Sequence, residues 1–346
     1  MDKIDFSKSE IYQEDIKSVF KFKCDWNKLK NKTILITGAT GLIGTYLVDM
    51  FFALDKEYKL NVKLILIARH VPEIKLSNVK YVALDISKPF NIDEKIDFII
   101  HAASNTHPVQ YSTFPISTIT TNVFGIYNLL ELASKNTGCR VELVSSVEIY
   151  GNDVQNIENG FSENDFGFLD CNTVRAGYNE SKRLSETLCQ AYKAEKNTDV
   201  VIARLCRSYG PTLKKDDSKA LSQFLRNGLN KQNIVLKSKG EQYFSYIYAA
   251  AAASALIYLL LKGESGQAYN VADKKSDIKL KDLAGLIADY SSTKVIFELP
   301  DEVEAKGFSK SQTAILNSTK INSLGWHPQY DIKEGIKRTL ECLKNC

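Results

Sequence analysis

The sequence predicts an α/β protein with a doubly wound parallel sheet and a smaller C-terminal lobe. Apolar runs alternate with helical patterns from residue 31 to about residue 205, as in sheets whose parallel strands are joined by helices. Runs such as 64–67 and 200–203 are continuously apolar, which is expected of strands buried on both faces. Beyond residue 206 the pattern is less regular, and we interpret that part as the second lobe.

The expected elements follow from these patterns in chain order. A helical extension is predicted over 1–30, where Ser7 and Glu10 fit a capping box. Strands are predicted at 33–36, 62–68, 80–84, 96–100, 141–145 and 199–205. Helices are predicted near 42–55, 113–136, 172–197 and 218–230.

The turn after the first predicted strand is the most informative segment of the chain. Gly38, Gly41 and Gly44 separate the apolar run Thr33–Ile36 from a helical pattern. Closely spaced glycines let the backbone approach a diphosphate, while free N–H groups and the helix dipole attract its charge. Such spacing also makes ordinary tight turns, but its position between a strand and a helix favours a nucleotide site.

Composition argues against several other classes of protein. The net charge of +4 is too small to indicate a nucleic acid or an anionic membrane as a partner. The N-terminus lacks the layout of a signal peptide, and the longest apolar run, 247–261, is too short to span a bilayer and predicts a buried helix. Seven Cys without a CxxC pair indicate free thiols in a cytoplasmic protein, and no metal site is expected.

Tyr178 and Lys182 form the leading candidate for chemistry. They are four residues apart in a predicted helix, so both side chains lie on one face. A nearby ammonium stabilises a phenolate and makes the Tyr usable as a base near neutral pH. The same spacing occurs at Tyr192/Lys196, Tyr258/Lys262 and Tyr290/Lys294. Spacing alone therefore does not decide between these pairs.

The segment Ser145–Gly151 distinguishes the Tyr178 pair from the others. It follows a predicted strand, and ligands of doubly wound sheets bind beyond the carboxyl ends of the strands. If the chain stays extended there, Ser146 and Glu148 point to the same side, with Val147 opposite. Serines after a strand also serve as turn or helix caps.

Together these motifs resemble the extended short-chain dehydrogenase/reductase family, in its branch of sugar-nucleotide epimerases, dehydratases and decarboxylases. The resemblance extends from about Asn31 to Thr339. The matching segments are Thr37–Gly44, Asp85-Ile86, His101–Ser104, Asn122 with Gly125, Ser145–Gly151, Tyr178–Lys182, Ala203-Arg204, Tyr209–Pro211, Tyr269–Val271 and Leu324–Trp326. The family implies a Rossmann fold, a nicotinamide cofactor and a sugar-nucleotide substrate.

The resemblance also implies a role for each matched residue. Tyr178 is the implied base for a sugar hydroxyl, Lys182 holds the nicotinamide ribose, and Ser146 bonds the reacting oxygen. The residues implied to bind the cofactor are Gly38, Thr40, Gly41, Leu42, Ile43, Gly44, Asp85, Ile86, Ala102, Ala103, Tyr178 and Lys182. The residues implied to bind the substrate are Ser104 and Asn122.

We therefore divide the chain into three parts. The helical extension covers 1–30, and the dinucleotide-binding core covers 31–205, with later elements near 235–271 rejoining it. The substrate lobe is formed by 206–234 and 272–346. A two-fold homodimer through the helices near 113–136 and 172–197 is expected, as the family implies.

The end of the second strand departs from the pattern of NAD-preferring members. These usually carry an acid there for the ribose hydroxyls, whereas this chain has Ala68-Arg69-His70. An Arg suits a 2′-phosphate, so Arg69 favours NADP slightly over NAD. Stacking of Arg69 on the adenine would instead serve either cofactor.

Three further departures affect the predicted reaction. Val147 replaces the Asp of glucose-type dehydratases, while Glu148 is kept. Phe244 aligns with an Arg that usually reaches the substrate phosphate or, in decarboxylases, the sugar carboxylate, and Ala251 aligns with an Asp that caps a helix. Arg207 replaces a frequent Asn, and either supplies the phosphate interaction that Phe244 cannot make or forms a surface salt bridge.

These observations favour an enzyme that oxidises a ring hydroxyl of a sugar nucleotide, at carbon 4, with bound NAD or NADP. Glu148 is the expected base beside the resulting ketone, so an epimerase or a dehydratase is the leading interpretation. A decarboxylase ranks below these because of Phe244, and a keto-sugar reductase would leave Glu148 without a task. The alternative from a different class is a non-catalytic dinucleotide-binding sensor or scaffold, in which loss of Tyr178 or Lys182 is expected.

Overall fold

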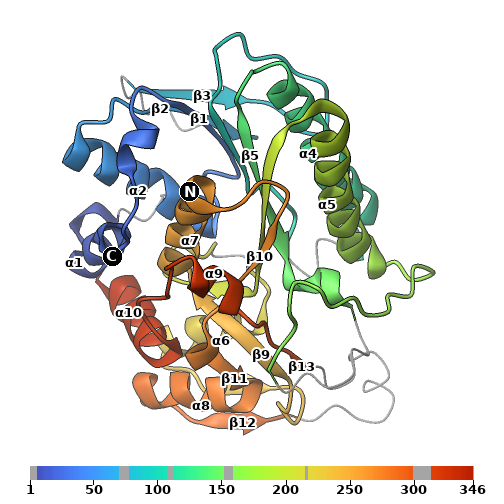
Figure 1. Ribbon diagram of the computed structural model, residues 1–346. Coiled ribbons are helices and arrows are strands. Elements are labelled where there is room, and N and C mark those ends of the chain that lie inside the picture. Colours follow the sequence, from blue (N-terminus) through green and yellow to red (C-terminus); the bar gives the residue numbers. More distant parts are fainter. Residues whose placement is uncertain are drawn as a thin grey trace.

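The fold centres on a seven-stranded sheet in which every pairing is parallel (Figure 1). The computed structural model describes residues 6–69, 78–106, 112–151, 159–214, 217–298 and 313–345. The strand order is β10-β6-β5-β4-β1-β2-β3. The strands are β1 (Thr33–Thr37), β2 (Lys63–Ala68), β3 (Val79–Ala83), β4 (Phe98–His101), β5 (Arg140–Ser146), β6 (Asp199–Leu205) and β10 (Ala268–Val271). The predicted fold class and the six predicted strands are confirmed.

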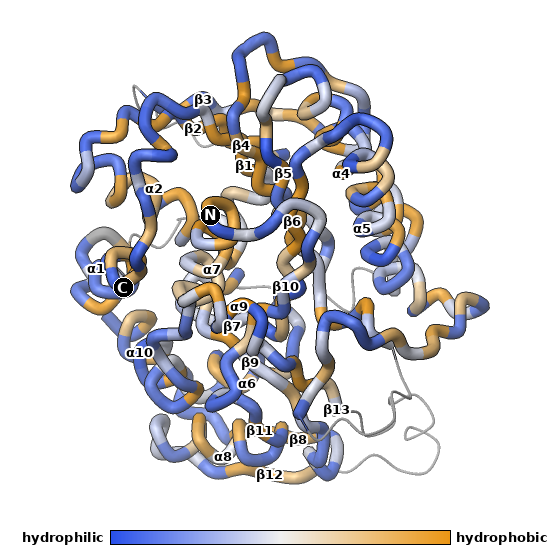
Figure 2. The backbone as a smooth tube through the Cα atoms, viewed as in Figure 1, coloured by the Kyte–Doolittle hydropathy of each residue, from blue (hydrophilic) through white to orange (hydrophobic). Residues whose placement is uncertain are grey.

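Helices cover both faces of this sheet, as doubly wound topology requires. One face carries α2 (Leu42–Tyr58) and α7 (Ala249–Lys262), and the other carries α4 (Pro115–Ser134) and α5 (Ala176–Lys196). Successive residues of β1 alternate between the two cores: Ile34 packs in the first and Leu35 in the second. The apolar central strands are visible in Figure 2 as the orange stretches of β1, β4 and β5.

The order of the strands determines where the expected ligand crevice lies. β1 pairs with β2 on one side and with β4 on the other, so the chain reverses its direction of winding between β1 and β4. Helices that follow neighbouring strands then leave on opposite faces and open a crevice at the carboxyl ends. Thr37 and His101 are register partners at this edge.

In the described residues of the C-terminal part there are two small sheets and four helices outside the main sheet layer. β9 (Tyr243–Tyr248) pairs with β11 (Asp277–Lys279), β13 (Thr313–Ala314) and β7 (Arg207–Tyr209), and β8 (Ile234–Leu236) pairs with β12 (Val295–Phe297). The helices are α6 (Ala220–Leu229), α8 (Leu280–Ser291), α9 (Thr319–Ser323) and α10 (Ile332–Lys344). β10 and α7 belong to the main sheet layer, and the domain division itself stays a prediction.

The N-terminal segment is helical as expected, but its cap differs from the prediction. It consists of η1 (Phe6–Lys8), α1 (Glu10–Lys17), η2 (Ser18–Lys21) and η3 (Trp26–Leu29), where η marks a 3-10 helix. The N-cap of α1 is Ser9, whose hydroxyl accepts the N–H of Tyr12. The expected Ser7 cap was wrong because a separate 3-10 turn ends at Lys8, immediately before Ser9.

The apolar run near residue 250 forms a helix in the protein interior. α7 is buried over Ala249–Leu261, as predicted, although the run begins within β9. Tyr248 stands at its N-cap position, and the Tyr248 side chain does not cap the helix. Within the described ranges no helix combines the length and apolar character needed to cross a membrane.

Candidate active site

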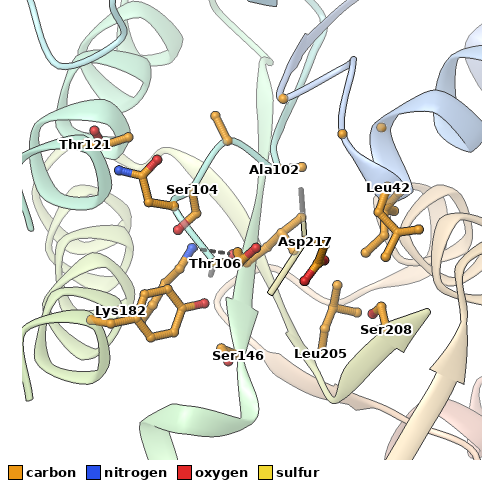
Figure 3. A pocket seen from close by; sticks show the side chains of 18 of the residues that line it. Leu42, Ala102, Ser104, Thr106, Thr121, Ser146, Lys182, Leu205, Ser208 and Asp217 are labelled. Carbon is orange, nitrogen blue, oxygen red and sulfur yellow. Dashed lines mark hydrogen bonds between the residues drawn. The ribbon is translucent and has the colours of Figure 1, made fainter. Parts of the chain in front are cut away.

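A cavity of about 1080 Å³ lies at the carboxyl ends of the central strands. Its lining includes Gly38 and Ser146 of the sheet layer and Leu221 and Phe244 of the C-terminal part. In Figure 3, Leu42 lies across the cavity from Lys182 and Ser146. The space is large enough for an extended ligand held between the two parts.

The glycine turn forms the first wall of the cavity. Gly38 has φ +73°, and a Cβ there would meet the backbone of Ala102 and Ala103 at 2.8 Å. A Cβ on Gly44 would meet the Gly38 oxygen at 2.1 Å, so helix α2 packs this close to the turn only with glycine. Both positions therefore require glycine for steric reasons.

The start of α2 fits a dinucleotide diphosphate. Gly41 is the N-cap, and as a glycine it has no side chain that could cap the first N–H groups of the helix. Thr40, Leu42 and Ile43 line the cavity beside it. Uncapped N–H groups at a helix N-terminus attract a phosphate. The residues present thus fit the predicted cofactor, and the turn is where they would hold it.

The predicted adenine end lies at the carboxyl ends of β2 and β3. Arg69, Asp85 and Ile86 all line the cavity, while His70 falls outside the described residues. Asp85 Oδ1 accepts hydrogen bonds from the hydroxyl and the N–H of Ser87 at 2.7 and 3.0 Å. These bonds lower the pKa of Asp85, and the nearby Arg69 charge adds to the effect.

The end of β4 supplies Ala102, Ala103 and Ser104 to the same wall. Its backbone is held by Thr37, whose hydroxyl accepts the N–H of Ala103 at 3.1 Å. The Thr37 hydroxyl also lies 2.8 Å from Nδ1 of His101. Burial lowers the pKa of His101 to about 3, so this ring is neutral and has a structural task.

Asn122 does not lie where the prediction placed it. It is buried within α4, accepts the Ser104 hydroxyl at 2.7 Å, and donates to the Ser181 hydroxyl at 2.8 Å. Ser104 and Thr121 line the cavity, and Asn122 lies behind them. The geometry therefore gives Asn122 a supporting role, linking the end of β4 to α5, instead of a substrate contact.

Tyr178 and Lys182 come together on the first turns of α5, as predicted. Both are buried and both line the cavity. Lys182 Nζ donates to the carbonyl of Val144 at 2.8 Å, which fixes it against the end of β5 (Figure 3). Burial lowers the pKa of Lys182 to about 8. A lysine buried beside a phenol in a cavity is a typical acid–base arrangement.

The conformation after Ser146 differs from the expected extended chain. The Ser146 hydroxyl accepts the N–H of Glu148 at 3.2 Å and starts the 3-10 helix η4 (Val147–Tyr150). The expectation was wrong because a serine at this position caps the following turn. Ser146 and Glu148 nevertheless line the same cavity.

Two side chains hold Glu148 in this position. Asn179 Nδ2 donates to the Glu148 carbonyl at 2.9 Å and lies 3.4 Å from Oε2. Arg207 Nη2 lies 3.4 Å from Oε1. No role is predicted for Asn179 from the sequence; its position next to Tyr178 in the matched segment Tyr178–Lys182 is the signal that could have found it.

Arg207 lies flat on the aromatic ring that replaces the usual arginine. Its guanidinium carbon is 3.5 Å from the centroid of Phe244, and both residues line the cavity. Arg207 thus lies at the cavity and forms an ion pair with Glu148 there, and its interaction with a substrate phosphate stays a prediction. Ala251 lies in α7, three residues beyond the N-cap position.

Comparison with known proteins identifies the family of the chain. Residues 34–272 match the model described as "NAD dependent epimerase/dehydratase family". The chain belongs to this family. Its predicted family and its nature as an enzyme are thereby confirmed.

Curated relatives in this family cover nearly the whole chain. UDP-glucuronic acid decarboxylase 6 of Arabidopsis thaliana is 27% identical over 319 residues, which cover 88% of this chain and 87% of the relative. UDP-glucuronic acid decarboxylase 1 of Xenopus tropicalis is 28% identical, covering 89% and 71%.

Solved structures share the fold at lower identity. A UDP-glucose 4-epimerase of Thermotoga maritima, solved with UDP-glucose, has a TM-score of 0.75 at 19% identity and covers 90% of this chain and 99% of its own. A dTDP-glucose 4,6-dehydratase of Streptomyces venezuelae, solved with NAD, has a TM-score of 0.75 at 23% identity, covering 90% and 97%.

Proposed function

We propose that the protein oxidises a ring hydroxyl of a sugar nucleotide, at carbon 4, and then rearranges the keto sugar. The observation that carries this proposal is the meeting of Ser146, Tyr178 and Lys182 in the cavity that the glycine turn also lines. When bound, NAD supplies the acceptor for a hydride. The rest of the chemistry falls to side chains of this chain.

The first step depends on the Tyr178 pair. Tyr178 takes the proton of the hydroxyl, and the adjacent ammonium of Lys182 stabilises the phenolate that does so. The Ser146 hydroxyl orients the reacting oxygen. Because both Tyr178 and Lys182 are buried, water is kept away from the proton transfer.

The second step depends on Glu148. A ketone acidifies the neighbouring C–H bonds, and Glu148 lies on the same cavity wall as Ser146. A carboxylate there takes a proton beside the ketone, which leads to epimerisation or to loss of water. An epimerase or a dehydratase therefore remains the leading proposal.

Decarboxylation is the second candidate, and two observations favour it. The curated relatives described above are UDP-glucuronic acid decarboxylases. Arg207 brings a guanidinium to the position from which Phe244 removes one. The argument from Phe244 that ranks a decarboxylase below an epimerase or a dehydratase is therefore weakened.

The choice of cofactor and the oligomeric state are part of the same proposal. Arg69 at the adenine end supports a slight preference for NADP over NAD. A row of exposed apolar side chains supports a homodimer through α4 and α5. They are Ile116, Ile119, Phe124 and Tyr127 of α4 and Leu184 of α5.

The experiment that tests the function is mass spectrometry of products from UDP- and dTDP-linked sugars. Loss of water indicates dehydration, loss of carbon dioxide indicates decarboxylation, and an isomer of unchanged mass indicates epimerisation. Tyr178→Phe should abolish every product while leaving cofactor binding nearly intact, because only the proton-accepting oxygen is removed. Tyr192→Phe is the matched control, since Tyr192 and Lys196 have the same spacing. A fully active Tyr178→Phe enzyme would refute the site.

A further inference from the structure

The short helix η4, which carries Glu148, is held at its C-terminal end by side chains of α5. The last carbonyl groups of a helix have no hydrogen-bond partner within the helix. Asn179 Nδ2 donates to the carbonyl of Glu148 at 2.9 Å, and Arg183 Nε donates to the carbonyl of Ile149 at 2.7 Å. Two consecutive carbonyls at the end of η4 are therefore satisfied by one helix.

Arg183 also ties η4 to the chain that follows it. Its Nη2 donates to the carbonyl of Gly167 at 2.8 Å, and the N–H of Gly167 donates to the carbonyl of Tyr150, also at 2.8 Å. The remaining guanidinium nitrogen, Nη1, lies 3.6 Å from Glu180 Oε1 on the same helix. Each of the three nitrogens of Arg183 thus has a partner within the fold, which makes this side chain an anchor for η4.

The two anchoring residues lie beside the reactive pair on α5. Asn179 and Arg183 are four residues apart, so their side chains lie on one face of the helix. They follow directly after Tyr178 and Lys182, which have the same spacing and line the cavity. Lys182 Nζ bonds to the carbonyl of Val144 at the end of β5. One helix therefore carries the pair for the first proton transfer and also fixes the turn that supplies the next carboxylate.

The carboxylate of Glu148 is itself held only weakly. Its Oε2 lies 3.4 Å from Asn179 Nδ2, and its Oε1 lies 3.4 Å from Arg207 Nη2. Charge-assisted hydrogen bonds are ordinarily shorter, at about 2.7–2.9 Å. The position of this side chain in the cavity therefore depends mainly on the backbone of η4. Asn179 and Arg183 are not among the residues that line the cavity, so they act on the site through that backbone.

We propose that Asn179 and Arg183 are positioning residues that place Glu148 for the second step of the reaction. The inference rests on the proposed function, in which Glu148 takes a proton beside the ketone. A general base must lie within hydrogen-bond distance of the proton that it takes, and a displacement of about 1 Å can slow a reaction about a hundredfold. Loss of either donor releases a carbonyl of η4 and lets the turn shift, whereas Tyr178 and Lys182 stay in place on α5.

The test separates hydride transfer from the step that follows it. The enzyme with bound cofactor is given UDP-glucose, dTDP-glucose and UDP-glucuronic acid, and the sugar that the wild type converts is used for the variants. Asn179→Ala and Arg183→Gln should each slow product formation at least about tenfold, with no rise in KM. Hydride transfer should change less than about threefold, so that reduced nicotinamide accumulates and is detected by its absorbance.

Two further variants separate these hydrogen bonds from general effects on α5. Gln190→Ala is the matched control, because Gln190 is an exposed amide of α5 that also donates to a carbonyl, but to that of Gly266, at 2.8 Å. It should leave both steps unchanged. Arg183→Lys keeps one donor and should lose less than Arg183→Gln; a Lys variant as slow as the Gln variant would overturn the anchoring role.

Hydrogen exchange tests the anchoring without substrate. The amides of η4 should exchange at least about threefold faster in Asn179→Ala and Arg183→Gln, because local opening becomes easier, and at the wild-type rate in Gln190→Ala. Unchanged exchange in both anchoring variants would overturn the inference.

The kinetic outcomes distinguish this inference from the function on which it rests. If Asn179→Ala and Arg183→Gln slow hydride transfer and product formation by equal factors, the inference is overturned and the proposed function stands. If Glu148→Gln completes the reaction at the normal rate, Glu148 is not the base, and the inference falls together with the proposed second step. A wild-type enzyme that converts none of the three sugars refutes the proposed function and this inference with it.

Discussion

Arg69 is an exposed side chain at the predicted adenine end of the cavity, and its charge adds to the hydrogen bonds from Ser87 that lower the pKa of Asp85. If it binds a 2′-phosphate, Arg69→Ala should weaken NADP by about 1.5–3 kcal/mol and leave NAD nearly unchanged. Fluorescence titration with each cofactor measures both affinities. Equal weakening of NADP and NAD would instead indicate stacking on the adenine, and the preference for NADP would be withdrawn.

Glu142 is a buried residue that the proposed chemistry does not use. It lies in β5 between its register partners Ile100 and Val201, and neither carboxyl oxygen has a hydrogen-bond partner among the described residues. Burial raises the pKa of Glu142 well above its usual range. A carboxyl group with a raised pKa in the folded state lowers the free energy of unfolding as the pH rises above its pKa in the unfolded chain. The reason is that the unfolded chain releases the proton more easily than the folded one.

Glu142→Gln should therefore stabilise the protein at pH 7–8 and much less near pH 4.5. Removing the ionisable group abolishes the pH-dependent cost, and the expected gain is about 1–3 kcal/mol, the scale for an unsatisfied buried group. Urea unfolding at several pH values measures the free energy. A variant that is equally or less stable at every pH would show that Glu142 has a partner in solution.

At the level of elements, α4 carries a group of exposed large apolar side chains, and Leu184 of α5 is exposed as well. Phe124 of α4 is 51% exposed, although apolar side chains of this size are usually buried. We expect a two-fold dimer that buries this surface, with a sedimenting mass about twice the 38.9 kDa of one chain. Phe124→Asp should shift the protein toward the monomer.

Phe297 of β12 provides the matched control for the dimer. It is also 51% exposed but lies on a different part of the molecule, so Phe297→Asp should leave the sedimenting mass unchanged. A wild-type protein of 38.9 kDa at micromolar concentration would reject the dimer. A shift caused equally by both variants would point to general destabilisation.

The helices and strands also show how much of the fold could be predicted from the sequence. Six of the seven strands of the main sheet were predictable, because apolar runs that alternate with helical patterns are typical of buried parallel strands. The seventh, β10, was predicted only as one of the later elements near 235–271 that rejoin the core. The turn after Ser146 was not predictable, because a single hydrogen bond, from the Glu148 N–H to the Ser146 hydroxyl, decides between an extended chain and a 3-10 helix. The burial of Asn122 depends on contacts with Ser104 and Ser181, which are distant in sequence.

The contact between Arg207 and Phe244 shows a second feature that could not be predicted from the sequence. The two residues are far apart in the chain and meet because β7 pairs with β9, with Arg207 opposite Tyr246. From the sequence, each is an isolated departure from the family pattern. Only the pairing of the strands shows that the Phe lies beneath the Arg, so that the two departures meet at one place in the cavity.

For the molecule as a whole, the N-terminal segment joins parts of the chain that are distant in sequence. α1 lies beside both α2 and α10 (Figure 1). Asp15 of α1 is fully buried and accepts hydrogen bonds from Tyr46 of α2 at 3.0 Å and from Tyr248 of β9 at 2.5 Å. It also accepts one from Arg338 of α10 at 2.8 Å. One carboxylate thus connects α2 with the C-terminal part.

We expect Asp15→Asn to destabilise the protein by about 3–5 kcal/mol, the scale for leaving one partner of a buried ion pair without the other. Because Tyr46 belongs to the helix that begins at the glycine turn, cofactor affinity should fall as well. Denaturant unfolding and NAD titration measure the two effects. Glu14→Gln is the control: Glu14 also contacts Arg338, at 3.1 Å, but its side chain is 64% exposed, so the expected change is below about 1 kcal/mol. If the two variants lose equal stability, burial of Asp15 does not give it a special role, and the N-terminal segment is held by its apolar contacts instead.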